Sequence, residues 1–176
     1  MTMKRILLTW ILLGTLCVWG GCNRTKPQTP ANRPVKDTVT MGLMSLNQRY
    51  VQEATKQLET YVKNASIDYL MNEMGYWYHV QEAGNGPLAT EMEKLTIHRR
   101  EFALADTLTL YKDEVLQVRP AKREIMDAID QAFEHLHIGD SVSLLVPWYL
   151  AYGPKGDGGD ILPYTSIRVE LRILKE

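Results

Sequence analysis

Two apolar runs that flank a glycine-rich loop constrain the fold more than any other feature of the sequence. The first run, "DSVSLLVP", ends at Pro147, and the second, "SIRVELRIL", alternates apolar residues from Ile167 to Ile173 with charged ones. Successive side chains of a strand point to opposite faces, so the second run predicts a strand with one buried face. The loop between them, "YGPKGDGGD", follows a strand without opening a helix. The pattern therefore predicts a sheet with one face buried against a hydrophobic core.

The remaining periodicity adds two helices and further strands. Between Leu43 and Val62 an apolar residue recurs every three or four positions, which predicts an amphipathic helix. Its apolar face would either dock on its own domain or form a dimer contact. The stretch "GYWYHVQEAG" predicts a strand, and "EKLTIHRREFAL" predicts one whose alternation shifts phase at Phe102, as at a bulge. "DTLTLY" continues the strand pattern. A second helical period runs from Ile125 to Leu136, and Gly139 is placed to end it. This order predicts an α+β domain in which an antiparallel sheet packs on a helix.

The N-terminal residues have the pattern of an export signal. Lys4 and Arg5 precede an apolar run from Ile6 to Val18, and small residues then lead to Cys22. This junction resembles the lipobox of bacterial lipoproteins, in which the cysteine carries lipid; a plain secretory signal or an uncleaved anchor remains the alternative. We expect a signal peptide over 1–21, a polar tether with prolines over 22–42, the helix over 43–66 and the main domain over 67–176. This implies an envelope location, anchored to a membrane and facing the periplasm or the cell surface.

Charge and motifs argue against several classes of function. Twenty Lys and Arg residues against 21 Asp and Glu residues leave a net charge of -1, so we expect no nucleic-acid binding. The loop glycines fit neither the dinucleotide nor the phosphate-loop pattern. Asp157 and Asp160 lack the other ligands of a calcium loop, and His135 and His137 would lie on different faces of a helix. We expect no metal and no cofactor.

The C-terminal stretch resembles that of FKBP-type peptidyl-prolyl isomerases. The shared features are a strand that ends in Pro147, "AYG" at 151–153, glycines in the following loop, Pro163 and a final alternating strand. "EIMDAIDQAFEHLHIGDSVSL" resembles the family's helix and its exit, and the similarity begins near Gly75. With the lipobox and the preceding helix, the chain is most similar to the gliding-motility-associated FKBP-type lipoproteins of Bacteroidetes. The implied fold is an FKBP-like, strongly bent antiparallel sheet on one short helix, preceded by the amphipathic N-terminal helix.

The resemblance also implies a site and a reaction. The hydroxyl of Tyr152 would hold a substrate carbonyl, and an apolar pocket would be formed by Ile125, Met126, Ile161 and Val169. Ile129 replaces the family's tryptophan floor, Arg100 its early tyrosine, and Leu110 with Tyr111 its Phe-Asp pair, while Asp106 or Asp113 is a candidate for the missing acid. The expected function is prolyl isomerisation of exported, proline-containing clients; the alternative is a catalytically weak or inactive peptide-binding module.

Overall fold

The computed structural model describes residues 38–104 and 109–174. The chain divides into two compact units, Met1–Thr40 and Met41–Glu176, and the first is described only where helix α2 (Thr38–Asn64) begins. The expected signal peptide and Cys22 lie outside the described residues, as does most of the expected tether. Within the described ranges, α2 is not apolar enough to cross a membrane, and neither is any other helix.

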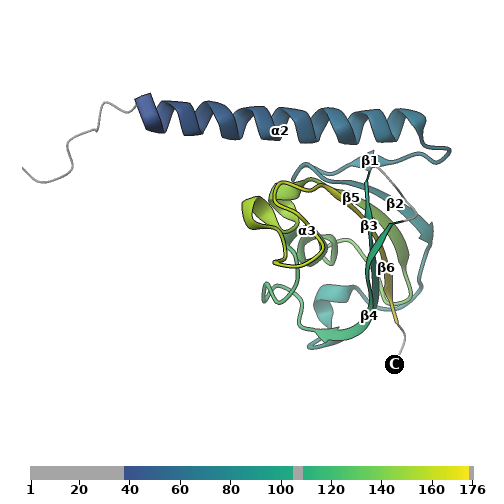
Figure 1. Ribbon diagram of the computed structural model, residues 1–176. Helices are drawn as coiled ribbons and strands as arrows, with labels where there is room; N and C mark the ends of the chain where they lie inside the picture. Colours follow the sequence, from purple (N-terminus) through teal and green to yellow (C-terminus); the bar gives the residue numbers. More distant parts are fainter. Residues whose placement is uncertain (1–37, 105–108, 175–176) are drawn as a thin grey trace, which may run out of the picture. The chain divides into compact units, whose positions relative to one another are not determined.

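Six antiparallel strands form one sheet (Figure 1). In the chain they are β1 (Leu70–Met71), β2 (Trp77–Glu82), β3 (Leu95–Ala103), β4 (Leu110–Val118), β5 (Ser141–Val146) and β6 (Ile167–Ile173). Their order across the sheet is β1-β2-β5-β6-β3-β4. The last strand is therefore central, and every second residue of β6 from Ile167 to Ile173 is at most 1% exposed, as its alternation predicts.

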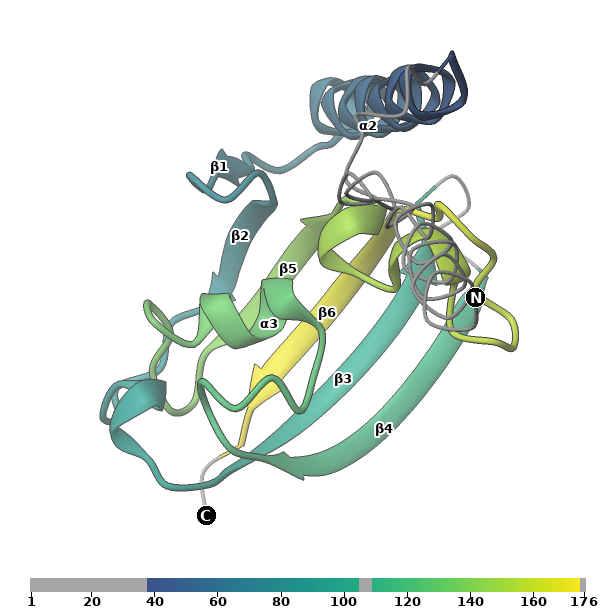
Figure 2. The same ribbon diagram turned by 90° about the vertical axis from the view of Figure 1, so that its left-hand side faces the viewer.

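The inner face of the sheet carries the main core. Helix α3 (Asp127–Ala132) lies across this face, and Figure 2 shows the strands curving around it. Ile129 and Phe133 are fully buried and join the inward residues of β3, β5 and β6 in one cluster. This arrangement confirms the predicted bent sheet on one short helix.

The outer face carries a second, smaller cluster. Leu58 of α2 is buried with Tyr69, Leu104 and Leu145, and Tyr61 and Val62 pack around them. The apolar stripe is covered only in part, because Leu43 and Leu46 near the start of the helix are 62% and 45% exposed. The C-terminal half of α2 thus docks on the domain.

Two local expectations had different outcomes. The phase shift at Phe102 is confirmed, since the pairing of β3 with β4 changes register between Glu101 and Phe102. The helix expected up to Leu136 was too long, because α3 ends at Ala132. The following residues pair with the segment before β3 instead: Leu136 O accepts from Ala89 N at 2.8 Å, and Ile138 N donates to Pro87 O at 3.0 Å. Gly139 lies in the turn into β5 and ends no helix.

Candidate functional site

The glycine-rich loop is a folded structure held by a single carboxylate. Asp157 Oδ1 accepts from the backbone N–H groups of Gly159 at 2.9 Å and of Ile161 at 3.0 Å. These bonds and Lys112 hold the pKa of Asp157 below its usual value, the Gly159 bond first. Gly156 has a φ of +69°, and a Cβ there would lie 2.2 Å from Ile161 O, so only glycine fits this position. The loop thereby turns Ile161 into the core, where it is 1% exposed.

An apolar wall faces this loop. Met126 is 8% exposed, and Ile129 and Val169 are fully buried in the same cluster as Ile161. Ile125 and Tyr152 are half-buried and pack against that cluster. The residues expected to form an apolar site therefore lie in one region, at the inner face of the sheet.

The hydroxyl of Tyr152 lies in a charged network. Its Oη donates to Glu101, whose carboxylate oxygens are 2.7 and 2.8 Å away, and accepts from Lys112 Nζ at 2.9 Å. Lys112 Nζ also lies 4.3 Å from the centre of the Tyr152 ring and 3.2 Å from Asp157 Oδ2. Burial, and next the bond to the negatively charged Glu101, raise the pKa of Tyr152 far above its ordinary value. The hydroxyl is therefore neutral and fully hydrogen-bonded.

Glu101 and Arg99 form the buried centre of this network. The Glu101 side chain is completely buried, and its Oε1 lies 3.1 Å from Arg99 Nη1. Arg99 pairs in addition with Glu114 of β4. Burial raises the pKa of Glu101, and Arg99, Tyr152 and Lys112 offset part of this effect. Glu101 is thus a buried acidic group beside Tyr152 that the sequence interpretation did not consider.

The sequence interpretation overlooked Arg99, Glu101 and Lys112. Leu95 and Ile97 point inward from β3, and their two-residue period continues to Arg99 and Glu101, which was the available signal. Lys112 pairs with Glu101 across β3 and β4, and it reaches the site for that reason.

Other expected site residues lie elsewhere. Arg100 pairs with Glu170, and its guanidinium lies 5.6 Å from the Phe102 ring, so its contacts lie outside the network around Tyr152. Leu110 is 47% exposed. Tyr111 is half-buried against the main core and also borders the cavity described below.

The two candidate acids of the sequence interpretation also differ in their outcome. Asp113 is 49% exposed and bonds His98 at 2.6 Å, so it does not serve as the acid of this site. Asp106 lies outside the described residues.

Aromatic residues close the base of the loop. Trp148 precedes the loop and Tyr164 follows it. Their rings pack edge to face, with the ring centres 4.8 Å apart. The ring of Tyr50 in α2 stacks on the Tyr164 ring, with the ring centres 4.1 Å apart. The backbone carbonyl of Tyr50 accepts a hydrogen bond from Trp148 Nε1 at 3.2 Å. Tyr164 has a φ of +59°, a strained value for a non-glycine residue that these contacts stabilise. Helix α2 thus contacts both ends of the loop that carries Tyr152.

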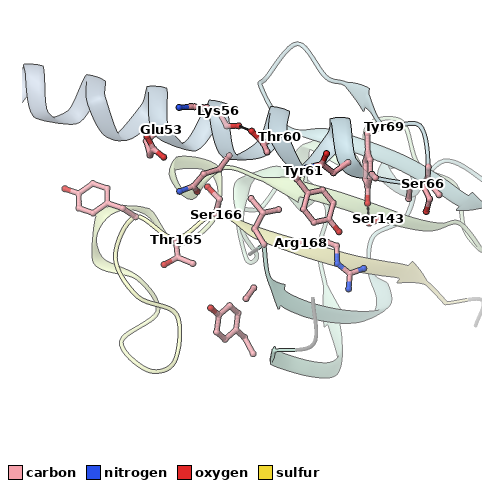
Figure 3. Close-up of a pocket in the computed structure, with 18 of the residues that line it drawn as sticks. Glu53, Lys56, Thr60, Tyr61, Ser66, Tyr69, Ser143, Thr165, Ser166 and Arg168 are labelled. Carbon is pink, nitrogen blue, oxygen red and sulfur yellow. Dashed lines mark hydrogen bonds between the residues drawn. The ribbon is translucent and has the colours of Figure 1, made fainter. Parts of the chain in front are cut away.

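A separate cavity of about 880 Å³ lies on the outer face, between α2 and the sheet. Figure 3 shows Thr60 and Tyr61 on the helix side, with Ser143 and Arg168 on the sheet side. Tyr69 and Ser143 share a hydrogen bond of 2.9 Å within it. Hydroxyl groups are frequent in its lining, in contrast to the apolar wall beside Tyr152.

Among the described residues, no group of three or more His, Cys, Asp or Glu side chains is placed to hold a metal ion. The carboxylates near Tyr152 bond Arg99, Lys112 and backbone N–H groups instead. The region around Tyr152 therefore combines a hydrogen-bonded network of charged groups with apolar side chains.

Comparison with curated proteins finds a relative among the peptidyl-prolyl isomerases. No protein-family model matches the chain. Its sequence is 24% identical over 131 residues to the FKBP-type 22 kDa peptidyl-prolyl cis-trans isomerase of Escherichia coli (strain K12). The alignment covers 73% of this chain and 62% of the relative, so the chain spans less than two thirds of the relative's length.

Solved structures share the fold. The peptidyl-prolyl cis-trans isomerase of Pseudomonas syringae pv. tomato superposes with a TM-score of 0.57 at 18% identity, covering 70% of this chain and 93% of the other. AtFKBP13 gives a TM-score of 0.56 at 17% identity, covering 62% of this chain and 99% of the other. The chain therefore has the FKBP fold, and in sequence it is similar to an FKBP-type peptidyl-prolyl cis-trans isomerase, as the resemblance of its C-terminal stretch predicted.

Proposed function

We propose that the domain is a peptidyl-prolyl cis-trans isomerase that binds proline-containing chains beside Tyr152. The main support is the position of Tyr152 next to the apolar wall of Met126, Ile161 and Val169. Such a site needs no nucleophile, because the barrier is rotation about the X–Pro amide, about 18–20 kcal/mol. The twisted amide has less charge separation than the planar one, so an apolar wall favours the twisted form.

The alternative is a module that binds proline-containing peptides without catalysis. The buried pair of Arg99 and Glu101 supports it, since Glu101 bonds the Tyr152 hydroxyl and Arg99 lies next to Glu101. Charges next to the reacting amide oppose the effect of an apolar wall. A low turnover with retained affinity is the outcome that this second candidate predicts.

Exchange NMR on a peptide with one X–Pro bond separates the two candidates. For the isomerase, wild-type protein accelerates cis-trans exchange, and Met126→Ala loses most of the acceleration. Val115→Ala is the control, because Val115 is 61% exposed on β4 and its partner on β3 is His98. Peptide affinity without acceleration at any protein concentration would reject the isomerase and favour the binding module.

We further propose an anchored location in a bacterial envelope, where exported chains would be the clients. The support is the sequence pattern that ends at Cys22, which the described residues do not include. Cys22→Ala should move the protein from the membrane fraction to the soluble fraction. Unchanged membrane association would disprove lipidation at this residue.

We also propose that the exposed start of α2 is where two copies would meet if the protein dimerises. Leu43, Met44 and Leu46 are each at least 45% exposed there. Leu43→Glu would then lower the apparent mass in sedimentation at high concentration. A mass that is monomeric in both proteins would exclude this contact.

A further inference from the structure

The only proton of the Tyr152 hydroxyl already has an acceptor. Tyr152 Oη is 2.7 and 2.8 Å from the two oxygens of Glu101, and a phenol has one O–H to donate. If that proton turned to a substrate carbonyl, the fully buried Glu101 would lose a hydrogen bond. The hydroxyl is therefore a poor donor to substrate.

Lys112 offers a donor at the same place. Its ammonium has three N–H groups, and the bonds to Tyr152 Oη and Asp157 Oδ2 use two of them. The Lys112 side chain is 29% exposed, whereas Glu101 is fully buried. Its Nζ lies over the Tyr152 ring, so a ligand that packs against this ring meets the ammonium.

The charges around Lys112 determine which acceptor it can take. Arg99 and Lys112 give two positive charges, and Glu101, Glu114 and Asp157 give three negative ones. The network has a net charge of -1, so it has no excess positive charge to hold a carboxylate. A neutral backbone carbonyl is the acceptor that fits.

We propose that Lys112 donates the hydrogen bond that holds the carbonyl of the X–Pro amide, in place of the Tyr152 hydroxyl. Tyr152 is then a positioning residue, which fixes the ammonium through its ring and its oxygen. This inference rests on the proposed function, because it assigns a residue to the same site.

A charged donor at this carbonyl has a defined kinetic effect. Resonance places more negative charge on the oxygen of the planar amide than on that of the twisted one. The ammonium therefore stabilises the bound planar substrate more than the transition state. Such an interaction lowers KM and kcat together, so Lys112 increases affinity and limits turnover.

The test compares Lys112→Met with Lys112→Arg and with Lys155→Met. Lys155 is the matched control, because it is an exposed lysine of the same loop. Exchange NMR on one X–Pro peptide gives both the affinity and the exchange rate of the bound peptide. We expect Lys112→Met to weaken affinity about tenfold, as for loss of one partly exposed charged hydrogen bond, and to raise kcat. Lys112→Arg should restore both values, and Lys155→Met should change neither.

Two results would overturn the inference. One is an affinity of Lys112→Met equal to that of wild type. The other is a fall in both affinity and kcat, which a misplaced loop would produce and which loss of a ground-state contact would not. If neither wild type nor any variant accelerates exchange, the proposed isomerase function fails, and the affinity comparison still decides whether Lys112 holds the peptide.

Discussion

Replacing Leu58 by alanine tests whether helix α2 is an integral part of the folded domain. Leu58 is 2% exposed and packs with Tyr69, Leu104 and Leu145 on the outer face. A buried Leu→Ala change costs about 2–5 kcal/mol, and the cost depends on the cavity that remains. Among the described residues, the outer cluster has only three other buried members, so fewer contacts are lost there than in the main core. We expect the lower part of the range, about 2–3 kcal/mol.

Urea denaturation measures this difference, and the control is Leu46→Ala on the same helix. Leu46 is 45% exposed, and its replacement should change the free energy of unfolding by at most about 0.5 kcal/mol. The midpoint of thermal unfolding should fall by roughly 5–10 °C for Leu58→Ala. Equal stability of the two variants would show that α2 does not pack on the sheet. Hydrogen exchange would then find the amides of α2 no better protected in wild type than in Leu58→Ala.

Two further predictions concern the site. Burial raises the pKa of Glu101 above its ordinary value of 4.5, so its contribution to stability is fully present below that value and is lost as pH rises through the raised pKa. The free energy of unfolding of wild type should therefore fall relative to Glu101→Gln as pH rises above 4.5, and a pH-independent difference would contradict the raised pKa. In the loop, Gly156→Ala should destabilise more than Gly158→Ala in urea denaturation. Both have positive φ, but only at Gly156 does an added Cβ meet backbone within 4 Å, and equal losses would mean that backbone strain alone matters.

The sequence pattern predicted the sheet well because the strands follow simple alternation. The inward residues of β6 and the bulge at Phe102 could both be read from polarity alone. The end of α3 could not, because tertiary pairing decides it. His137 forms an isolated bridge with Leu88, far away in sequence, and this bridge takes the place of a further helical turn.

The site was predicted less completely than the fold. The resemblance identified Tyr152 and the apolar residues around it, and the structure places Met126, Ile161 and Val169 in one cluster. It did not identify the charged network, because charged residues are expected at the surface. Glu101 violates this expectation: it is fully buried, and its partners are Arg99 on the same strand and Tyr152 in the distant loop.

The aromatic contact between Trp148 and Tyr164 affects how much conformational entropy the loop loses when a ligand binds beside it. Ordering a flexible loop costs conformational entropy, and part of this cost comes from bringing its two ends together. Here the ends meet through the two rings, and Tyr50 of α2 stacks on the second ring. The loop is therefore ordered before any ligand arrives, which reduces the entropy lost on binding. Under the proposed function, removing α2 would leave every residue beside Tyr152 in the chain and still weaken peptide binding, because the ligand would then have to order the loop.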